Sequence, residues 1–106
     1  MAFKVQKEIT PQEVAEQLRH GKELIMLDVR ESVEWVEGHV EGAIHIPLGQ
    51  LMQRYHELDS TQEVIIMCRS GNRSGLACEL LSEKGLKVAN MTGGLSKWTA
   101  FDKLVR

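Results

Sequence analysis

Two short runs of apolar residues, each free of polar alternation, constrain the fold of this chain most strongly. The first spans residues 24–27 (LIML) and ends at Asp28, and the second spans residues 64–67 (VIIM) and ends at Cys68. A strand with one face in water alternates between apolar and polar residues, whereas a continuous apolar run predicts a strand covered on both faces. Buried strands of this kind are typical of a parallel sheet with helices packed on it.

Residues 10–13 (TPQE) predict the start of a helix. Thr10 is suited to the N-cap, Pro11 to the first helical position, and Glu13 to the closing position of a capping box. Gly21 suits the position just after the helix, because glycine readily adopts the positive φ that ends many helices.

The remaining elements alternate between strand and helix. Residues 43–47 and 87–91 predict short strands, residues 48–58 and 74–84 predict helices, and residues 3–6 predict a short first strand. This alternation predicts an α/β domain with a mainly parallel sheet. With 106 residues, 42% of them apolar, the whole chain is expected to form a single domain around one modest core.

The charge balance excludes a generally basic protein that coats nucleic acid. Lysine and arginine number 13 and aspartate and glutamate number 15, so the formal net charge is −2. No apolar run approaches the roughly 20 residues of a membrane-spanning helix, and the first residues lack the apolar core of a secretory signal. We therefore expect a cytoplasmic protein with no membrane partner. In a reducing compartment, cysteines are more often catalytic, metal-binding or buried than cross-linked.

The densest chemistry lies at residues 67–75 (MCRSGNRSG), between a predicted strand and a predicted helix. In parallel sheets, functional sites form beyond the carboxyl ends of the strands, where both Asp28 and Cys68 are expected. A strand–loop–helix turn directs several backbone N–H groups into one concavity, and the helix adds the positive end of its dipole. We expect this field to lower the pKa of the Cys68 thiol and to hold an anionic substrate.

Cys68 could instead simply end a buried strand, as small apolar cysteines often do. The residues that follow it favour a functional cysteine, because two glycines permit a tight loop and Arg69 and Arg73 add two cations. Both phosphoryl transfer and sulfur transfer use a cysteine in an anion-binding loop, so these residues alone leave the reaction type open.

Three segments, in this order, resemble the single-domain rhodaneses, which are thiosulfate sulfurtransferases. Residues 28–30 (DVR), with Trp35 and residues 38–47 (GHVEGAIHIP), are similar to the upstream motif of that family. Residues 68–74 are similar to its active-site loop, and residues 93–98 (GGLSKW) to its closing motif. The size and layout resemble the small bacterial enzymes of the glycerol-regulon and phage-shock type. The resemblance implies a rhodanese-like α/β fold, with a five-stranded, mainly parallel sheet and helices on both faces.

The resemblance also implies a mechanism. The Cys68 thiolate would attack the outer sulfur of thiosulfate or of another persulfide donor, sulfite would leave, and Cys68 would carry a persulfide. A thiol or cyanide would then take the sulfur, with ping-pong kinetics. The implied acceptors are a cellular thiol such as glutathione or a thioredoxin-like protein, and no metal or organic cofactor is required.

The resemblance implies roles for residues around the cysteine. The loop that would bind substrate and persulfide comprises Arg69, Ser70, Gly71, Asn72, Arg73 and Ser74. Arg69 is expected to project outward and attract the anionic donor. Arg73 is expected to turn inward and pair with Asp28, while Asp28 and Arg30 support the loop. Ser74 is expected to be the N-cap of the following helix.

The length of the loop separates sulfur transfer from cysteine phosphatase or arsenate reductase chemistry. Four residues separate Cys68 from Arg73, one fewer than in cysteine phosphatases, and the shorter ring suits a persulfide better than a tetrahedral phosphate. Met67 also occupies the place where many cysteine phosphatases have a histidine. Two alternatives remain: a sulfur carrier loaded by a partner protein, and a non-catalytic interaction domain. The retained Cys68 disfavours the second.

Several other residues are expected to serve the fold. Cys78 follows Cys68 by ten residues, mostly along one helix, so a disulfide between them is disfavoured and Cys78 is expected to pack in the core. Trp35 and Trp98 are expected to be packing anchors, and His39 is expected to brace a loop. The acidic stretch is expected to be a solvated face: Glu31, Glu34, Glu37 and Glu41.

Overall fold

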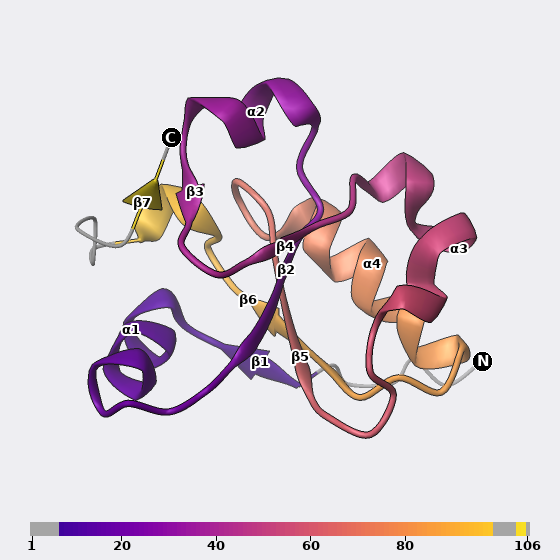
Figure 1. Ribbon diagram of the computed structural model, residues 1–106, viewed down its shortest axis with the longest axis horizontal. Coiled ribbons are helices and arrows are strands. Elements are labelled where there is room, and N and C mark those ends of the chain that lie inside the picture. Colours follow the sequence, from indigo (N-terminus) through magenta and orange to yellow (C-terminus); the bar gives the residue numbers. More distant parts are fainter. Residues whose placement is uncertain (1–6, 99–103, 106) are drawn as a thin grey trace.

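A five-stranded sheet forms the centre of the computed structural model, which describes residues 7–98 and 104–105 (Figure 1). Its strands are, in spatial order, β1 (Glu8–Ile9), β6 (Val88–Met91), β5 (Val64–Met67), β2 (Ile25–Asp28) and β4 (Ile44–His45). All neighbouring pairs are parallel. The predicted α/β class is therefore confirmed, whereas the strand predicted at residues 3–6 lies outside the described residues.

The two apolar runs form the adjacent strands β2 and β5 in the middle of this sheet. Along β5, Val64 and Ile66 belong to one core cluster, and Ile65 and Met67 belong to the other. This division follows from the alternation of side chains between the two faces of a strand. Both faces of β5 are therefore covered, as its continuous apolar sequence requires.

Helices cover both faces of the sheet, as expected. α1 (Pro11–Arg19) packs on one face, and α3 (Leu51–Arg54) and α4 (Asn72–Glu83) pack on the other (Figure 1). α1 begins with the predicted capping box, in which the Thr10 and Glu13 side chains each accept the other residue's backbone N–H. In the described part of the chain, no helix has the length and apolar character needed to cross a membrane.

The segment at residues 48–58 is less regular than predicted. It contains α3 between two 3-10 turns, Leu48–Gln50 and Tyr55–Glu57. The Leu48 N–H donates to Val29 O at 3.0 Å. This bond ties the start of the segment to the chain leaving β2.

α4 starts at Asn72, earlier than the predicted residue 74. Its N-cap is Gly71, which has a φ of +101°. Glycine adopts this φ at little cost because it has no Cβ. The chain therefore turns directly from the cysteine loop into the helix.

The carboxyl ends of the strands carry the elements that matter for function. α2 (Ser32–Glu37) follows β2, the cysteine loop follows β5, and the 3-10 turn Leu95–Lys97 follows β6. Figure 1 shows α2 above the loop that leaves β5. A small second sheet, β3 (His39–Val40) antiparallel to β7 (Leu104–Val105), lies after α2.

Candidate active site

The loop between β5 and α4 closes around the sulfur of Cys68, which is completely buried. The N–H groups of Gly71 and Ser74 donate to Cys68 Sγ at 3.1 and 3.3 Å. The first N–H groups of an α-helix have no partner within the helix. The sulfur accepts a hydrogen bond from one of these groups, the Ser74 N–H, and so takes the place of an N-cap side chain.

Ser74 is therefore not the N-cap of α4, and this prediction was wrong. Because α4 begins at Asn72, Ser74 is its third residue, and its hydroxyl lies 3.3 Å from Cys68 Sγ. In the thiol form, Cys68 donates to Ser74 Oγ, and the Ser74 hydroxyl donates to Asn90 Oδ1 at 2.6 Å. When Cys68 is a thiolate, the same hydroxyl can turn and donate to the sulfur.

The pKa of Cys68 lies below that of an ordinary cysteine. Burial by itself raises this pKa, but hydrogen bonds from the Ser74 hydroxyl and from the N–H groups of Ser74, Gly71 and Ser70 together outweigh it. Cys78 packs in the same core cluster, where burial raises its pKa to about 12. One thiol is thus prepared to ionise, and the other serves as an apolar core residue.

Asn90 in β6 holds the cysteine loop, a role that the sequence did not predict. Its Nδ2 donates to Gly71 O at 3.3 Å while its Oδ1 accepts from Ser74, and its side chain is buried. The available signal was a polar residue inside the otherwise apolar stretch VANM of β6. A buried carboxamide needs partners for both of its ends, and here both partners belong to the loop.

The turn after β6 supports the loop from another side. The Leu95 N–H donates to Cys68 O at 2.8 Å, and the Ser96 N–H donates to Arg69 O at 2.9 Å. This approach requires glycine at position 94, where φ is +61° and a Cβ would lie 2.5 Å from the Arg69 carbonyl.

Arg73 pairs with Glu34, so the predicted pair of Arg73 with Asp28 was wrong. Arg73 Nη1 and Nη2 donate to Glu34 Oε1 and Oε2 at 2.6 and 2.9 Å. Asp28 is completely buried and is bound by Arg30, whose Nε and Nη2 donate to it at 3.0 and 2.8 Å. Arg30 Nη2 also donates to Gly38 O at 2.8 Å. The Asp28–Arg30 pair therefore joins β2 to the end of α2.

The position of α2 explains this change of partners. Arg30 lies two residues after Asp28 and folds back onto it, so the buried carboxylate is already paired. α2 carries Glu34 to the loop, where the side chain is only 16% exposed and not part of the predicted solvated face. The hydrogen bonds from Arg73 lower the pKa of Glu34 to about 2.

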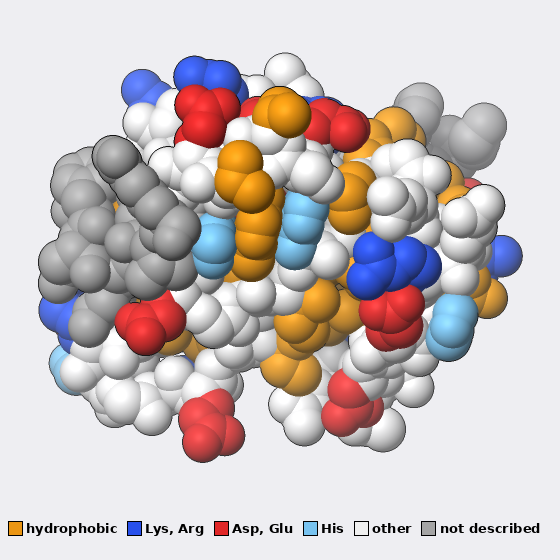
Figure 2. Space-filling view, turned by 45° about the horizontal axis from the view of Figure 1, so that its top comes forward, with side chains coloured by type: hydrophobic (Ala, Val, Ile, Leu, Met, Phe, Trp, Pro, Cys, Tyr) orange, Lys and Arg blue, Asp and Glu red, His pale blue; other side chains and the backbone are white. Residues whose placement is uncertain are grey.

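Two histidines brace α2 by stacking on Trp35. The Trp35 ring lies parallel to those of His39 and His45, with centroids 3.5 and 4.6 Å apart. Figure 2 shows a hydrophobic side chain between two histidine side chains on the surface. His39 Nδ1 donates to Trp35 O, and His45 Nε2 donates to Arg30 O, both at 2.8 Å. Among the described residues, no three side chains of types that ligate metals gather into one cluster.

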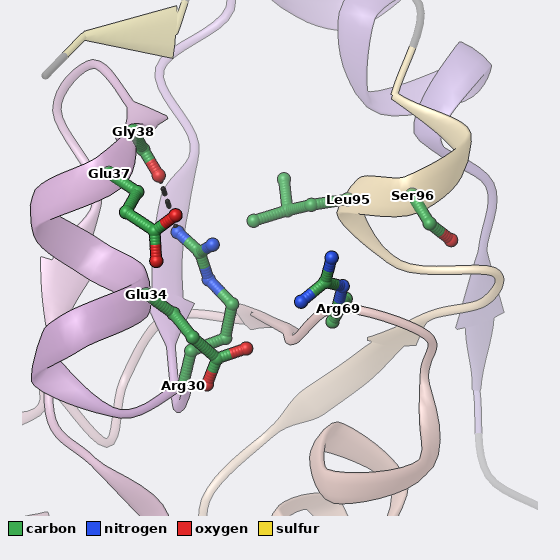
Figure 3. Close-up of a pocket in the computed structure, with 7 residues that line it drawn as sticks. All are labelled: Arg30, Glu34, Glu37, Gly38, Arg69, Leu95 and Ser96. Carbon is green, nitrogen blue, oxygen red and sulfur yellow. Dashed lines mark hydrogen bonds between the residues drawn. The ribbon is translucent and has the colours of Figure 1, made fainter.

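A pocket of about 310 Å³ opens beside the cysteine loop (Figure 3). It is lined by Arg30, Glu34, Glu37, Gly38, Arg69, Leu95 and Ser96. Arg69 is exposed and reaches this pocket, whereas the side chains of Ser70 and Asn72 are exposed on the rest of the loop. The loop thus presents one cation beside the buried sulfur.

The fold and this loop define a class: an α/β domain with an activated cysteine at the carboxyl edge of a parallel sheet. The family model of the rhodanese-like domain matches residues 10–101. The chain belongs to the rhodanese-like family. A crystal structure of a rhodanese-like domain protein from Staphylococcus aureus has a TM-score of 0.85 and 28% sequence identity, over 89% of this chain and 92% of that one.

Three curated relatives span most of the chain. "Putative sulfurtransferase YtwF" of Bacillus subtilis is 38% identical over 87% of this chain and 89% of its own length. "Putative sulfur carrier protein YrkF" of the same organism is 37% identical over 87% of this chain and 50% of its own length. "Thiosulfate sulfurtransferase GlpE" of Haemophilus influenzae is 32% identical over 87% of each chain.

Gly94→Ala is expected to destabilise the fold by at least about 2 kcal/mol, because the new Cβ overlaps backbone atoms of the loop and φ is positive. Urea denaturation measures the effect. Gly49→Ala is the matched control, since a Cβ at position 49 meets nothing within 4 Å. Equal stability of the two variants would contradict the close approach.

Ser74→Ala is expected to raise the pKa of Cys68, because the thiolate loses its side-chain hydrogen bond. Alkylation of Cys68 by iodoacetamide at neutral pH should slow about tenfold, the effect of one hydrogen bond to a charged group. The pH profile of the rate should shift to higher pH. Ser82→Ala, on the same helix, is the control, and an unshifted profile in Ser74→Ala would refute this role.

Glu34→Gln is expected to cost about 2 kcal/mol of stability at pH 7, because it breaks a partly buried bidentate ion pair. The pKa of Glu34 is lowered in the fold, so its contribution is complete above the ordinary carboxyl pKa and is lost as the pH falls toward 2. The difference from wild type should therefore shrink between pH 5 and pH 3. Glu63→Gln, which removes an exposed pair with Lys7, should cost under about 0.5 kcal/mol.

Proposed function

We propose that this chain is a sulfurtransferase that carries sulfur on Cys68, with thiosulfate as a donor and a thiol or cyanide as the acceptor. The observation that carries the proposal is the set of hydrogen-bond donors that surround Cys68 Sγ. They favour the thiolate, which is the nucleophilic form. The match to the family model and to a thiosulfate sulfurtransferase supports the same reaction.

In the first half-reaction, the Cys68 thiolate attacks the outer sulfur of thiosulfate. A bond forms between Sγ and that sulfur, and the S–S bond of thiosulfate breaks. Sulfite leaves with the electron pair of that bond, so Cys68 becomes a persulfide anion. The N–H groups of the loop stabilise this negative charge, and Arg69 at the rim attracts the anionic donor.

In the second half-reaction, a thiolate or cyanide attacks the outer sulfur of the persulfide. The new bond forms as the bond to Sγ breaks, which returns Cys68 to the thiolate and releases the acceptor as a persulfide or as thiocyanate. Glutathione and a thioredoxin-like protein are the proposed cellular acceptors. A reducing compartment such as the cytoplasm suits a chain whose two cysteines are both free.

The residues around the loop would act by holding its shape. Arg73 and Glu34 tie the loop to α2, and Asp28 and Arg30 hold the end of α2 in place. Ser74 and Asn90 keep the donors directed at the sulfur. A fixed loop stabilises the persulfide without reorganising during the reaction.

A second candidate is a sulfur-carrier module in which a partner protein loads Cys68. The similarity to a protein named as a sulfur carrier supports it. The two candidates differ in the donor. Faster loading by a cysteine desulfurase than by thiosulfate, without turnover of thiosulfate, would favour the carrier.

Incubation with thiosulfate is expected to add one sulfur atom to the protein, detected by mass spectrometry together with one equivalent of sulfite. Cys68→Ser should abolish the gain, because the nucleophile is missing. Cys78→Ser is the matched control and should keep it. An unchanged gain in Cys68→Ser would refute the proposal.

A further inference from the structure

Four charged side chains line the pocket beside the cysteine loop, two arginines and two glutamates. One arginine and one glutamate already have partners within the fold. Arg30 is bound to Asp28 and to Gly38 O. Glu34 is bound through both oxygens to Arg73. Of the charged groups that line this pocket, these two are therefore neutralised by the fold itself.

The other two charged groups, Glu37 and Arg69, have no ion-pair or hydrogen-bond partner for their side chains in the described part of the chain. Glu37 comes from α2 and Arg69 from the cysteine loop. Figure 3 shows them on opposite walls of the pocket, with Leu95 extending between those walls. The pocket thus offers one free anion, one free cation and an apolar side chain.

We propose that this pocket binds the head group of an α-amino-acid thiol that serves as the sulfur acceptor. Its ammonium group would lie at Glu37 and its carboxylate at Arg69. The inference rests on the proposed function, because it names the class of acceptor for the same site. A volume of about 310 Å³ suits a molecule of amino-acid size.

The charge pattern disfavours small thiols whose charges are all of one sign. A purely anionic thiol would be attracted by Arg69 but repelled by Glu37. A purely cationic thiol would be attracted by Glu37 but repelled by Arg69. A zwitterion satisfies both walls at once. Glu37 therefore acts as the residue that selects for an ammonium group.

The loop that carries Cys68 forms part of this pocket through Arg69. Arg69 follows Cys68 in the chain, and Leu95 and Ser96, which line the pocket, donate their N–H groups to the carbonyl oxygens of Cys68 and Arg69. An amino acid held between Glu37 and Arg69 would have its short thiol side chain next to the loop that carries the persulfide. Position and charge together suit the second half-reaction.

The test compares three acceptors of the persulfide-loaded protein: L-cysteine, 3-mercaptopropionate, which lacks the ammonium group, and 2-aminoethanethiol, which lacks the carboxylate. Glu37→Gln is expected to lower kcat/KM for L-cysteine relative to 3-mercaptopropionate about fivefold, the effect of one partly exposed ion pair. Each acceptor is compared between wild type and variant, so the different thiol pKa values cancel. Glu37→Lys should shift the ratio further, and Glu41→Gln, outside the pocket, should leave it unchanged.

A binding measurement keeps this inference separate from the proposed function. S-methyl-L-cysteine cannot accept sulfur because its thiol is methylated. An NMR titration of the protein with this compound should show saturable chemical-shift changes at Glu37 and Arg69. In Glu37→Gln, the affinity for the compound should fall about fivefold. Absence of this binding would overturn the inference, and so would an equal change of kcat/KM for all three acceptors in Glu37→Gln. Either result leaves the proposed function intact if thiosulfate still loads Cys68. Failure of thiosulfate to load Cys68, with binding retained, would count against the proposed function alone.

Discussion

The convergence of hydrogen-bond donors on Cys68 Sγ is the interaction on which the candidate site depends. Cys68 and Cys78 lie in the same apolar cluster. Burial alone raises the pKa of Cys78 to about 12, whereas the donors around Cys68 bring its pKa below the ordinary value. A buried thiolate without donors is costly because the apolar interior cannot solvate it. The chemistry therefore comes from the backbone of the loop as much as from the cysteine.

The loop keeps its donors in place because neighbouring elements hold it on several sides. Asn90 binds it from β6, and the turn after β6 binds the carbonyl oxygens of Cys68 and Arg69. The bidentate pair of Arg73 with Glu34 joins it to α2. A donor set fixed before the reaction stabilises the developing charge without further reorganisation. Three residues of these supports, Glu34, Leu95 and Ser96, also line the pocket, so the proposed acceptor site adjoins the contacts that hold the loop.

Much of the fold and the candidate reactive cysteine could be predicted from local patterns. The apolar runs before Asp28 and Cys68 predicted buried parallel strands, and the capping box at Thr10 and Glu13 forms as expected. The role of Asn90 in holding the loop could not be predicted, because Asn90 lies within a strand and its partners, Gly71 and Ser74, are distant in the sequence. Contacts across the sheet leave no trace in the spacing of one sequence.

The sequence by itself determined the two central strands, the position of the loop and the candidate nucleophile, because these depend on apolar patterning, helix capping and the residues adjacent to Cys68. Only the tertiary structure decided the partners of the charged groups. Arg73 binds Glu34, which is 39 residues away, because α2 lies over the loop, while Asp28 is already occupied by Arg30. Charge pairing depends on distance in space, and that distance is set by how the elements pack.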